Sequence, residues 1–130
     1  MKTNELLEKN PLSTEVIRTW FFDQMVKSFA DENVPEEFKE MMKQEGVTNE
    51  RLAILIDAQP RTLFDVFDEN NIIIETLLYP SGEFTIKIGN QATTNSWKTR
   101  KEAELFAIDA AFDVLEEKLK PIELPALEEN

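Results

Sequence analysis

The sequence predicts an α+β fold, with N-terminal helices packed on a three-stranded antiparallel sheet and a long C-terminal helix. Three observations predict it. Apolar residues recur at helical spacing before residue 60. Short β-branched or alternating segments follow between residues 72 and 98. Thr99 and Glu102 then form a capping box, in which the threonine oxygen accepts from the Glu102 N–H and the carboxylate reaches back to the Thr99 N–H. At 130 residues we expect a single domain.

The first helix is expected from about Thr14 to Ala30, with Ser13 as its N-cap and Pro11 just outside it. Apolar side chains cover most of its circumference, which is typical of a helix that is buried on several sides. The apolar set is Val16, Ile17, Trp20, Phe21, Phe22, Met25, Val26 and Phe29.

Three short helices are predicted to follow. Pro35 suits the first turn of one that ends at Gly46, and Thr48 caps the next. A fourth helix follows Pro60 and stops at residues 70–71, because proline at the first turn and asparagine at the end agree with a helix. The alternative for residues 64–67 is a strand that forms a hairpin with the next segment.

Three strands are expected in the middle of the chain. Residues 72–79 are β-branched and aromatic, which indicates the first strand. Residues 80–82 turn the chain, and residues 84–88 alternate apolar with polar side chains, as a strand with one wet face does. Residues 89–95 are predicted as a polar loop and residues 96–98 as a short third strand.

The last helix is expected from about Arg100 to Leu119, since Pro121 prevents its continuation. Two apolar stripes run along it, and we expect one to lie on the sheet and the other to meet neighbouring helices. The first is Leu105, Ile108, Phe112, Leu115 and Leu119, and the second is Ala103, Ala107, Ala110 and Val114. Between them an acidic ridge is predicted, made of Glu102, Asp109, Asp113 and Glu116.

The chain therefore divides, within a single domain, into four parts. These are a polar N-terminal segment (1–12), a helical portion (13–59), an α-β-β-β-α core (60–120) and a flexible acidic tail (121–130).

Composition excludes several kinds of function. With 14 basic and 26 acidic residues the net charge is −12, which disfavours binding to nucleic acid and to anionic membranes. The chain has no cysteine and no histidine, so disulfides, thiolate chemistry and the commonest general base are missing. No apolar run approaches the roughly 18 residues of a membrane helix, and the start does not read as a signal peptide. We expect a soluble, cytoplasmic protein.

Residues 60–119 resemble the double-stranded-RNA-binding domain in the order of their elements. In that family the second helix opens with a basic cluster, which Lys98, Arg100 and Lys101 match, and continues as an alanine-rich run. The alanines that match are Ala103, Ala107, Ala110 and Ala111. The chain departs from the family at Glu104, where lysine is expected, and in the short turn at 80–82, which lacks the longer histidine-bearing loop that reaches the minor groove. The resemblance implies the topology, and RNA binding as an alternative function.

Residues 63–70, with residues 99–104 and Ala111-Phe112, also resemble small uncharacterised proteins of phages and mobile elements of gut bacteria. This resemblance implies a phage-encoded accessory or virion protein, located in the host cytoplasm or the virion. It implies no activity.

Catalysis is not expected. The three glycines stand alone at turns and form no phosphate-binding loop. No histidine is present to activate a serine or threonine, and no Ser-x-x-Lys arrangement occurs. The carboxylates Asp65, Asp68 and Glu69 fit a solvated helix face better than a calcium site, which needs six to eight shaped oxygen ligands. We therefore predict no enzyme, cofactor, metal or small-molecule substrate.

The leading hypothesis is a protein–protein interaction or self-association module that uses Trp20, Phe21 and Phe22. These three aromatics and Trp97 together exceed what a small core easily hides. One alternative is an acidic decoy that presents Asp109 and Asp113 to a basic protein. The other is a nucleic-acid-binding module that uses Lys98, Arg100 and Lys101.

Overall fold

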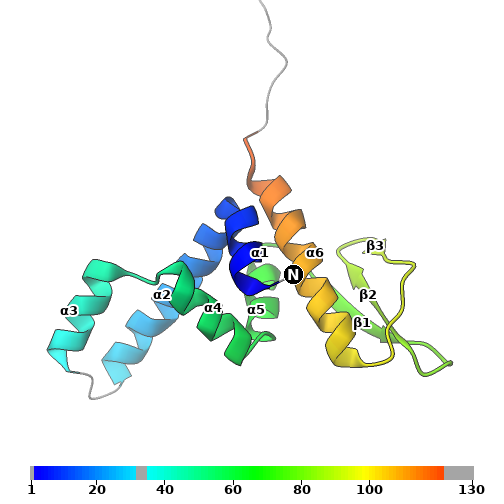
Figure 1. The fold of residues 1–130 in the computed structure, drawn as a ribbon, viewed down its shortest axis with the longest axis horizontal. Helices are drawn as coiled ribbons and strands as arrows, with labels where there is room; N and C mark the ends of the chain where they lie inside the picture. Colours follow the sequence, from blue (N-terminus) through cyan, green and yellow to red (C-terminus); the bar gives the residue numbers. More distant parts are fainter. Residues whose placement is uncertain (1, 32–34, 122–130) are drawn as a thin grey trace, which may run out of the picture.

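Six helices and a three-stranded antiparallel sheet make up the described part of the chain, residues 2–31 and 35–121 of the computed structural model (Figure 1). This confirms the α+β class and the α-β-β-β-α order of the C-terminal half. Of the predicted tail, 121–130, only Pro121 lies within the described residues. The elements are α1 (Thr3–Lys9), α2 (Pro11–Asp31), α3 (Glu36–Glu45), α4 (Asn49–Ala58), α5 (Thr62–Glu69), β1 (Ile74–Leu78), β2 (Phe84–Ile88), β3 (Gln91–Ala92) and α6 (Arg100–Leu119).

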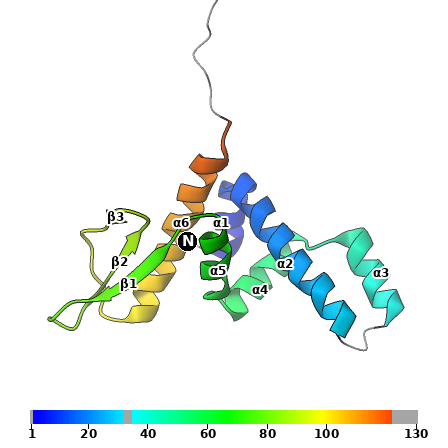
Figure 2. The ribbon, with the colours of Figure 1, turned by 180° about the vertical axis from the view of Figure 1, so that it is seen from behind.

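The long helix α6 lies between the sheet and the other helices (Figure 1; Figure 2 shows the same arrangement from behind). Its alanines Ala103 and Ala107 are fully buried against Ile86 of β2. Ile108, Phe112 and Leu115 belong to the main core, together with buried side chains from α1, α2, α4 and α5. The prediction that one stripe meets the sheet and the other meets helices is therefore confirmed.

Each predicted stripe, however, includes a residue that is not packed. Leu105 of the first stripe and Val114 of the second are exposed, because they stand at the margins of the two packed faces. The capping box at the start of α6 is confirmed in its first half, since the Glu102 N–H donates to Thr99 Oγ1 at 3.2 Å. The second half differs from the prediction, because the Glu102 carboxylate accepts from the Thr99 hydroxyl, at 2.9 Å, where the backbone N–H of Thr99 was expected as the donor.

The N-terminal residues, polar in composition, form the helix α1 and contribute Leu6 and Leu7 to the core. After Asn10 the helix α2 begins at Pro11, where a missing N–H costs nothing. The prediction that Ser13 is an N-cap is wrong. Ser13 lies inside α2, and its hydroxyl donates to the Phe112 carbonyl oxygen at 2.9 Å.

The short helices follow their local signals. Thr48 Oγ1 caps α4 by accepting from the Arg51 N–H at 3.2 Å. Residues 64–67 are helical rather than extended, and α5 ends where Asn71 takes a left-handed conformation with φ 64°. This turn lets the Ile72 N–H donate to the Phe67 carbonyl at 2.8 Å.

The strands lie in the order β1-β2-β3. In the β1–β2 hairpin Ile74 stands opposite Ile88 and Leu78 opposite Phe84. The predicted third strand at 96–98 is wrong: β3 is Gln91–Ala92, inside the segment predicted as a loop. Gly89, with φ 60°, makes a two-residue turn possible, so the chain pairs again at once. Trp97 makes only an isolated bridge to Phe84.

Candidate interaction surfaces

The predicted aromatic anchors Trp20, Phe21 and Phe22 lie on α2 at the edge of the core and are half-buried. The Trp20 ring meets Phe21 edge-on, with 5.2 Å between ring centroids. Its indole N–H donates to the carboxylate of Glu69 and so joins α2 to α5. These aromatics therefore pack helices together within the chain, and a surface whose apolar side chains are more exposed lies elsewhere.

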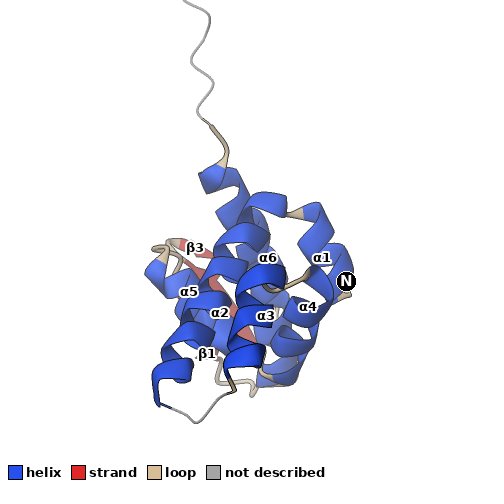
Figure 3. Ribbon diagram, turned by 90° about the vertical axis from the view of Figure 1, so that its left-hand side faces the viewer, coloured by secondary structure: helices blue, strands red, loops and turns tan. Residues whose placement is uncertain are grey.

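That surface is a groove walled by the C-terminal half of α2, by α3 and by α4, at the end of the molecule opposite the sheet. Figure 3 looks at this end, with α2, α3 and α4 toward the viewer. The groove has a volume of about 330 Å³, and its lining, called the helical groove below, is Met25, Phe38, Met41, Met42, Val47, Arg51, Ile54 and Leu55. All the lining side chains except Arg51 are apolar.

The spacing of the lining residues explains why they share one surface. On α3 the residues are Phe38, Met41 and Met42, and α4 repeats the same i, i+3, i+4 pattern with Arg51, Ile54 and Leu55. Each set occupies one helix face, and the two faces meet over the groove. Phe38 packs edge-on against Phe29 of α2, with 6.0 Å between centroids, which holds α3 beside α2.

Several lining side chains remain open to solvent although the groove is apolar. Ile54 is 68% exposed, and Phe38, Met41 and Leu55 are exposed as well. Arg51 does not cover them, since its guanidinium contacts Glu45 at 3.3 Å and the Met42 sulfur at 3.6 Å. Three of the four methionines of the chain line this groove. Flexible methionine side chains are typical of surfaces that adapt to a partner.

The acidic ridge predicted on α6 is not a continuous wet surface. Glu116 is only 8% exposed, and its carboxylate accepts from the Ser13 N–H at 2.8 Å and from the Leu12 N–H at 3.3 Å. It thereby satisfies backbone donors in the first turn of α2, which carries the positive end of the helix dipole. Sequence reasoning missed this role because the partners are about a hundred residues apart.

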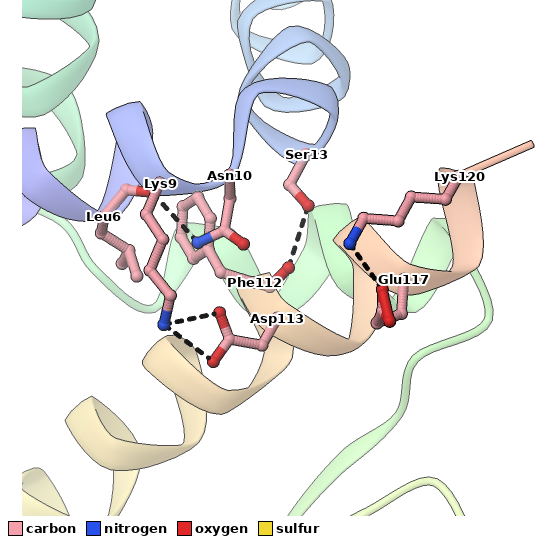
Figure 4. Close-up of polar contacts among 8 residues, drawn as sticks. All are labelled: Leu6, Lys9, Asn10, Ser13, Phe112, Asp113, Glu117 and Lys120. Carbon is pink, nitrogen blue, oxygen red and sulfur yellow. Dashed lines mark hydrogen bonds and ion pairs between the residues drawn. The ribbon is translucent and has the colours of Figure 1, made fainter.

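The two ridge residues proposed for a decoy, Asp109 and Asp113, have neighbours within the chain. Asp113 forms an ion pair with Lys9 of α1 at 3.3 Å, drawn with the Ser13–Phe112 hydrogen bond in Figure 4. Asp109 is half-buried. Burial raises the pKa of Asp109, and the nearby Asp113 carboxylate raises it further while Lys9 opposes the shift. The ridge therefore serves contacts between α1, α2 and α6.

The basic residues of the nucleic-acid alternative are all exposed at the start of α6. Arg100 places its guanidinium 5.7 Å from the centroid of the Phe84 ring. The structure adds Arg61, which lines the same shallow pocket as Arg100 and Lys101 and pairs with the buried Glu104 at 3.5 Å. Sequence order could not show this, because Arg61 lies on a different element.

A second open cleft lies between α6 and the strands β2 and β3. Its volume is about 710 Å³, and its walls include Ile86, Ile88, Phe106, Val114 and Asp113. Phe106, one of the lining residues, also contacts Trp97, with 4.7 Å between ring centroids and an angle of 37° between the rings. The lining mixes apolar and polar groups, so the cleft is less apolar than the helical groove.

No group of three or more acidic side chains in the described ranges is arranged to hold a metal ion. Asp65 and Asp68 are exposed on α5, and Glu69 is engaged by Trp20. Among the residues whose burial the structure describes, two carboxylates are buried, Glu104 and Glu116, and both contact groups of this chain.

Within residues 2–31 and 35–121 no helix combines the length and the hydropathy that crossing a bilayer requires. Comparison of the chain with protein-family models, with curated proteins and with solved structures finds no match. The two family resemblances of the sequence therefore stay predictions.

Proposed function

We propose that this chain is a non-enzymatic protein–protein interaction module, and that its helical groove receives an amphipathic helix of a partner protein. The observation that carries the proposal is the set of exposed apolar side chains around that groove, with Ile54 at 68% exposure. Isolated apolar residues are normal on a surface, but a contiguous apolar groove marks a binding site.

A helix is the occupant that the walls of the groove favour. All of the lining residues except Val47 lie on helices, and those on α3 and α4 stand at i, i+3 and i+4 positions. Ridges of this kind interdigitate with those of another helix, and helix-in-groove recognition uses the same spacing on the partner. Leucine, isoleucine or phenylalanine side chains at that spacing would fill the space between Phe38 and Leu55.

The charge around the groove indicates which residues should flank the apolar face of the partner helix. Acidic side chains outnumber basic ones on α3 and α4, and the only basic lining residue, Arg51, already contacts Glu45. The whole chain carries a net charge of −12. A partner helix with lysine or arginine beside its apolar face is therefore favoured over one with acidic flanks, mainly through its rate of association.

The chemistry of the side chains supports a binding role over turnover. The sequence holds no histidine or cysteine, and the buried carboxylates are occupied by backbone N–H groups or by Arg61. The resemblance to phage and mobile-element proteins is a reason to search for the natural partner among proteins of a bacterial host.

The test uses two synthetic helical peptides with the same leucine face, one with lysine flanks and the other with glutamate flanks. Fluorescence anisotropy should show that the unmodified chain binds the lysine-flanked peptide more tightly. Ile54→Glu should weaken this binding at least tenfold, because it places a charge in the apolar contact. Leu105→Glu is the matched control, since Leu105 is an exposed leucine outside the groove.

Equal binding of the two peptides, or equal loss in Ile54→Glu and Leu105→Glu, would contradict the proposal. Far-ultraviolet circular dichroism of each variant checks that the helices remain.

The second candidate function, binding to double-stranded RNA, is supported by the gathering of Arg61, Arg100 and Lys101 around one shallow pocket.

A further inference from the structure

The strand β1 has an exposed outer edge. It lies at one end of the sheet order β1-β2-β3, so only one side of it is paired. The bonds from the Gly89 N–H to the Ile73 oxygen and from the Tyr79 N–H to the Glu83 oxygen, both 2.8 Å, show which residues face β2. By the alternation of an antiparallel ladder these are the odd-numbered residues 73 to 79.

The backbone groups of Ile74, Thr76 and Leu78 therefore point away from β2. No hydrogen bond between described residues reaches these three N–H groups or their carbonyl oxygens across the outer edge. Natural edge strands are normally protected by proline, by several charges or by a bulge. Within Ile74–Leu78 the only charge is Glu75, and the register with β2 has no bulge.

We propose that β1 pairs with the β1 strand of a second copy of this chain, antiparallel and centred on Thr76. The result is a six-stranded sheet with β1 strands at its centre. A two-fold axis perpendicular to the sheet passes through the Thr76 pair and leaves both α6 helices on the same face. This inference extends the proposed binding role to self-association, and it concerns a surface on the opposite side of α6 from the helical groove (Figure 2).

The strand is complementary to itself in this register. The outward-facing residues then pair with one another, Thr76 with Thr76 and Ile74 with Leu78, so each pair exchanges two backbone hydrogen bonds. Leu78, which is 64% exposed in the single chain, gains an apolar neighbour. On the outer face Ile73 stands opposite Tyr79, and both are exposed in the single chain.

The neighbouring registers are worse. A shift that centres the pairing on Glu75 places two glutamates directly opposite each other, which is unfavourable. The shift that centres it on Leu77 brings Pro80 opposite Ile74, and proline has no N–H to donate. Of these three registers, the one centred on Thr76 avoids both problems, because each Glu75 then faces Leu77 of the other copy and Pro80 lies beyond the paired residues 74–78.

This pairing predicts opposite effects for two charged substitutions at one position. Leu77→Glu sets a carboxylate opposite Glu75 twice in the dimer, so it should weaken dimerisation. Leu77→Lys sets an ammonium opposite Glu75 twice and should strengthen dimerisation, by roughly 2- to 30-fold for two cross-strand ion pairs. If dimerisation depended only on apolar contact around Leu77, without this register, both charged substitutions would weaken it.

Sedimentation equilibrium measures the dimer constant of each variant. Leu105→Glu and Leu105→Lys are the matched controls, because Leu105 is 45% exposed and Leu77 is 40% exposed. Neither control should change the dimer constant. Thr76→Pro should abolish dimerisation and keep the hairpin, since the Thr76 N–H does not face β2. Added salt should favour the dimer, because two copies of charge −12 repel each other.

The proposal is overturned if the unmodified chain remains a monomer up to millimolar concentration, or if both charges at position 77 act in the same direction. It is also overturned if Ile54→Glu in the helical groove, and not Leu77→Glu, removes the dimer. Conversely, the β1 pairing is supported if substitutions at position 77 change the dimer constant while Ile54→Glu leaves it unchanged. That result does not depend on whether the helical groove binds a peptide. If Thr76→Pro fails to fold, the pair of substitutions at position 77 still decides the question.

Discussion

Replacing Glu116 by alanine should destabilise the chain strongly, although the residue belongs to a helix with many other carboxylates. Its carboxylate accepts from the Ser13 N–H at 2.8 Å and from the Leu12 N–H at 3.3 Å, and it is 8% exposed. A hydrogen bond to a charged group contributes about 1.5–3 kcal/mol, and a longer one contributes less. The charge at the N-terminus of α2 adds about 0.3–1 kcal/mol.

These terms give an expected loss of about 2–4 kcal/mol in the free energy of unfolding for Glu116→Ala. Glu116→Gln keeps an acceptor oxygen and loses the charge, so it should lie between alanine and the unmodified chain. Urea denaturation followed by tryptophan fluorescence measures both, since Trp20 and Trp97 report on α2 and on the sheet. The slope of the transition should stay the same, because the folded chain buries the same surface.

The neighbouring Glu117→Ala is the control. Glu117 is exposed and pairs with Lys120 at 2.8 Å on the surface, where such pairs contribute little. Its urea midpoint should match that of the unmodified chain. A loss below about 1 kcal/mol for Glu116→Ala, or an equal loss in Glu117→Ala, would refute the reasoning that this carboxylate stabilises the start of α2.

Two further predictions concern the charged residues of α6. Burial raises the pKa of Asp109 above its ordinary value of 3.8, so the folded chain keeps the proton on this carboxyl to a higher pH than the unfolded chain does. The protonated group therefore stabilises the fold at low pH, and this stabilisation is lost as the pH rises from about 3.8 through the raised pKa. Asp109→Asn should therefore become more stable relative to the unmodified chain across that pH range in urea titrations; a constant difference would contradict the assignment. Gel shifts with duplex RNA test the alternative function: any complex should weaken with salt and be lost in the charge-reversed variant Arg100→Glu, Lys101→Glu, and retention of the complex in that variant would exclude this surface.

Local signals in the sequence predicted most helices. Thr48 and Thr99 cap α4 and α6 as expected, because an N-cap interacts with a backbone only three residues away. The helix α5 was preferred over a strand for similarly local reasons, and Asn71 ends it. Predictions of this kind succeed when donor and acceptor are close in sequence.

Predictions that depended on distant partners were the ones that failed. Ser13 has the side chain of an N-cap, but its hydroxyl donates to the Phe112 carbonyl oxygen and its N–H donates to the Glu116 carboxylate. The third strand was placed at Trp97, where the pattern is β-like, whereas the tight turn at Gly89 lets Gln91 and Ala92 pair first. Which segment pairs depends on turn geometry as well as on side-chain pattern.

The candidate surfaces were harder to predict than the fold. Aromatic content singled out Trp20, but its indole bridges to Glu69 inside the chain. The most exposed side chain of the helical groove is Ile54, and an aliphatic residue in a helical pattern cannot be told from a core residue. Exposure depends on where neighbouring helices end, and no single segment contains that information.

The contacts between α2 and α6 also bear on synthesis of the protein. Leu6, Leu7 and Ile17 are covered by side chains that include Phe112 and Leu115, which a ribosome adds about a hundred residues later. At a translation rate of about 5–20 residues per second, these three apolar side chains stay without their final partners for several seconds or more. A chaperone that binds apolar segments therefore has its main opportunity before the last helix emerges, and translation pauses upstream of residue 100 would prolong it.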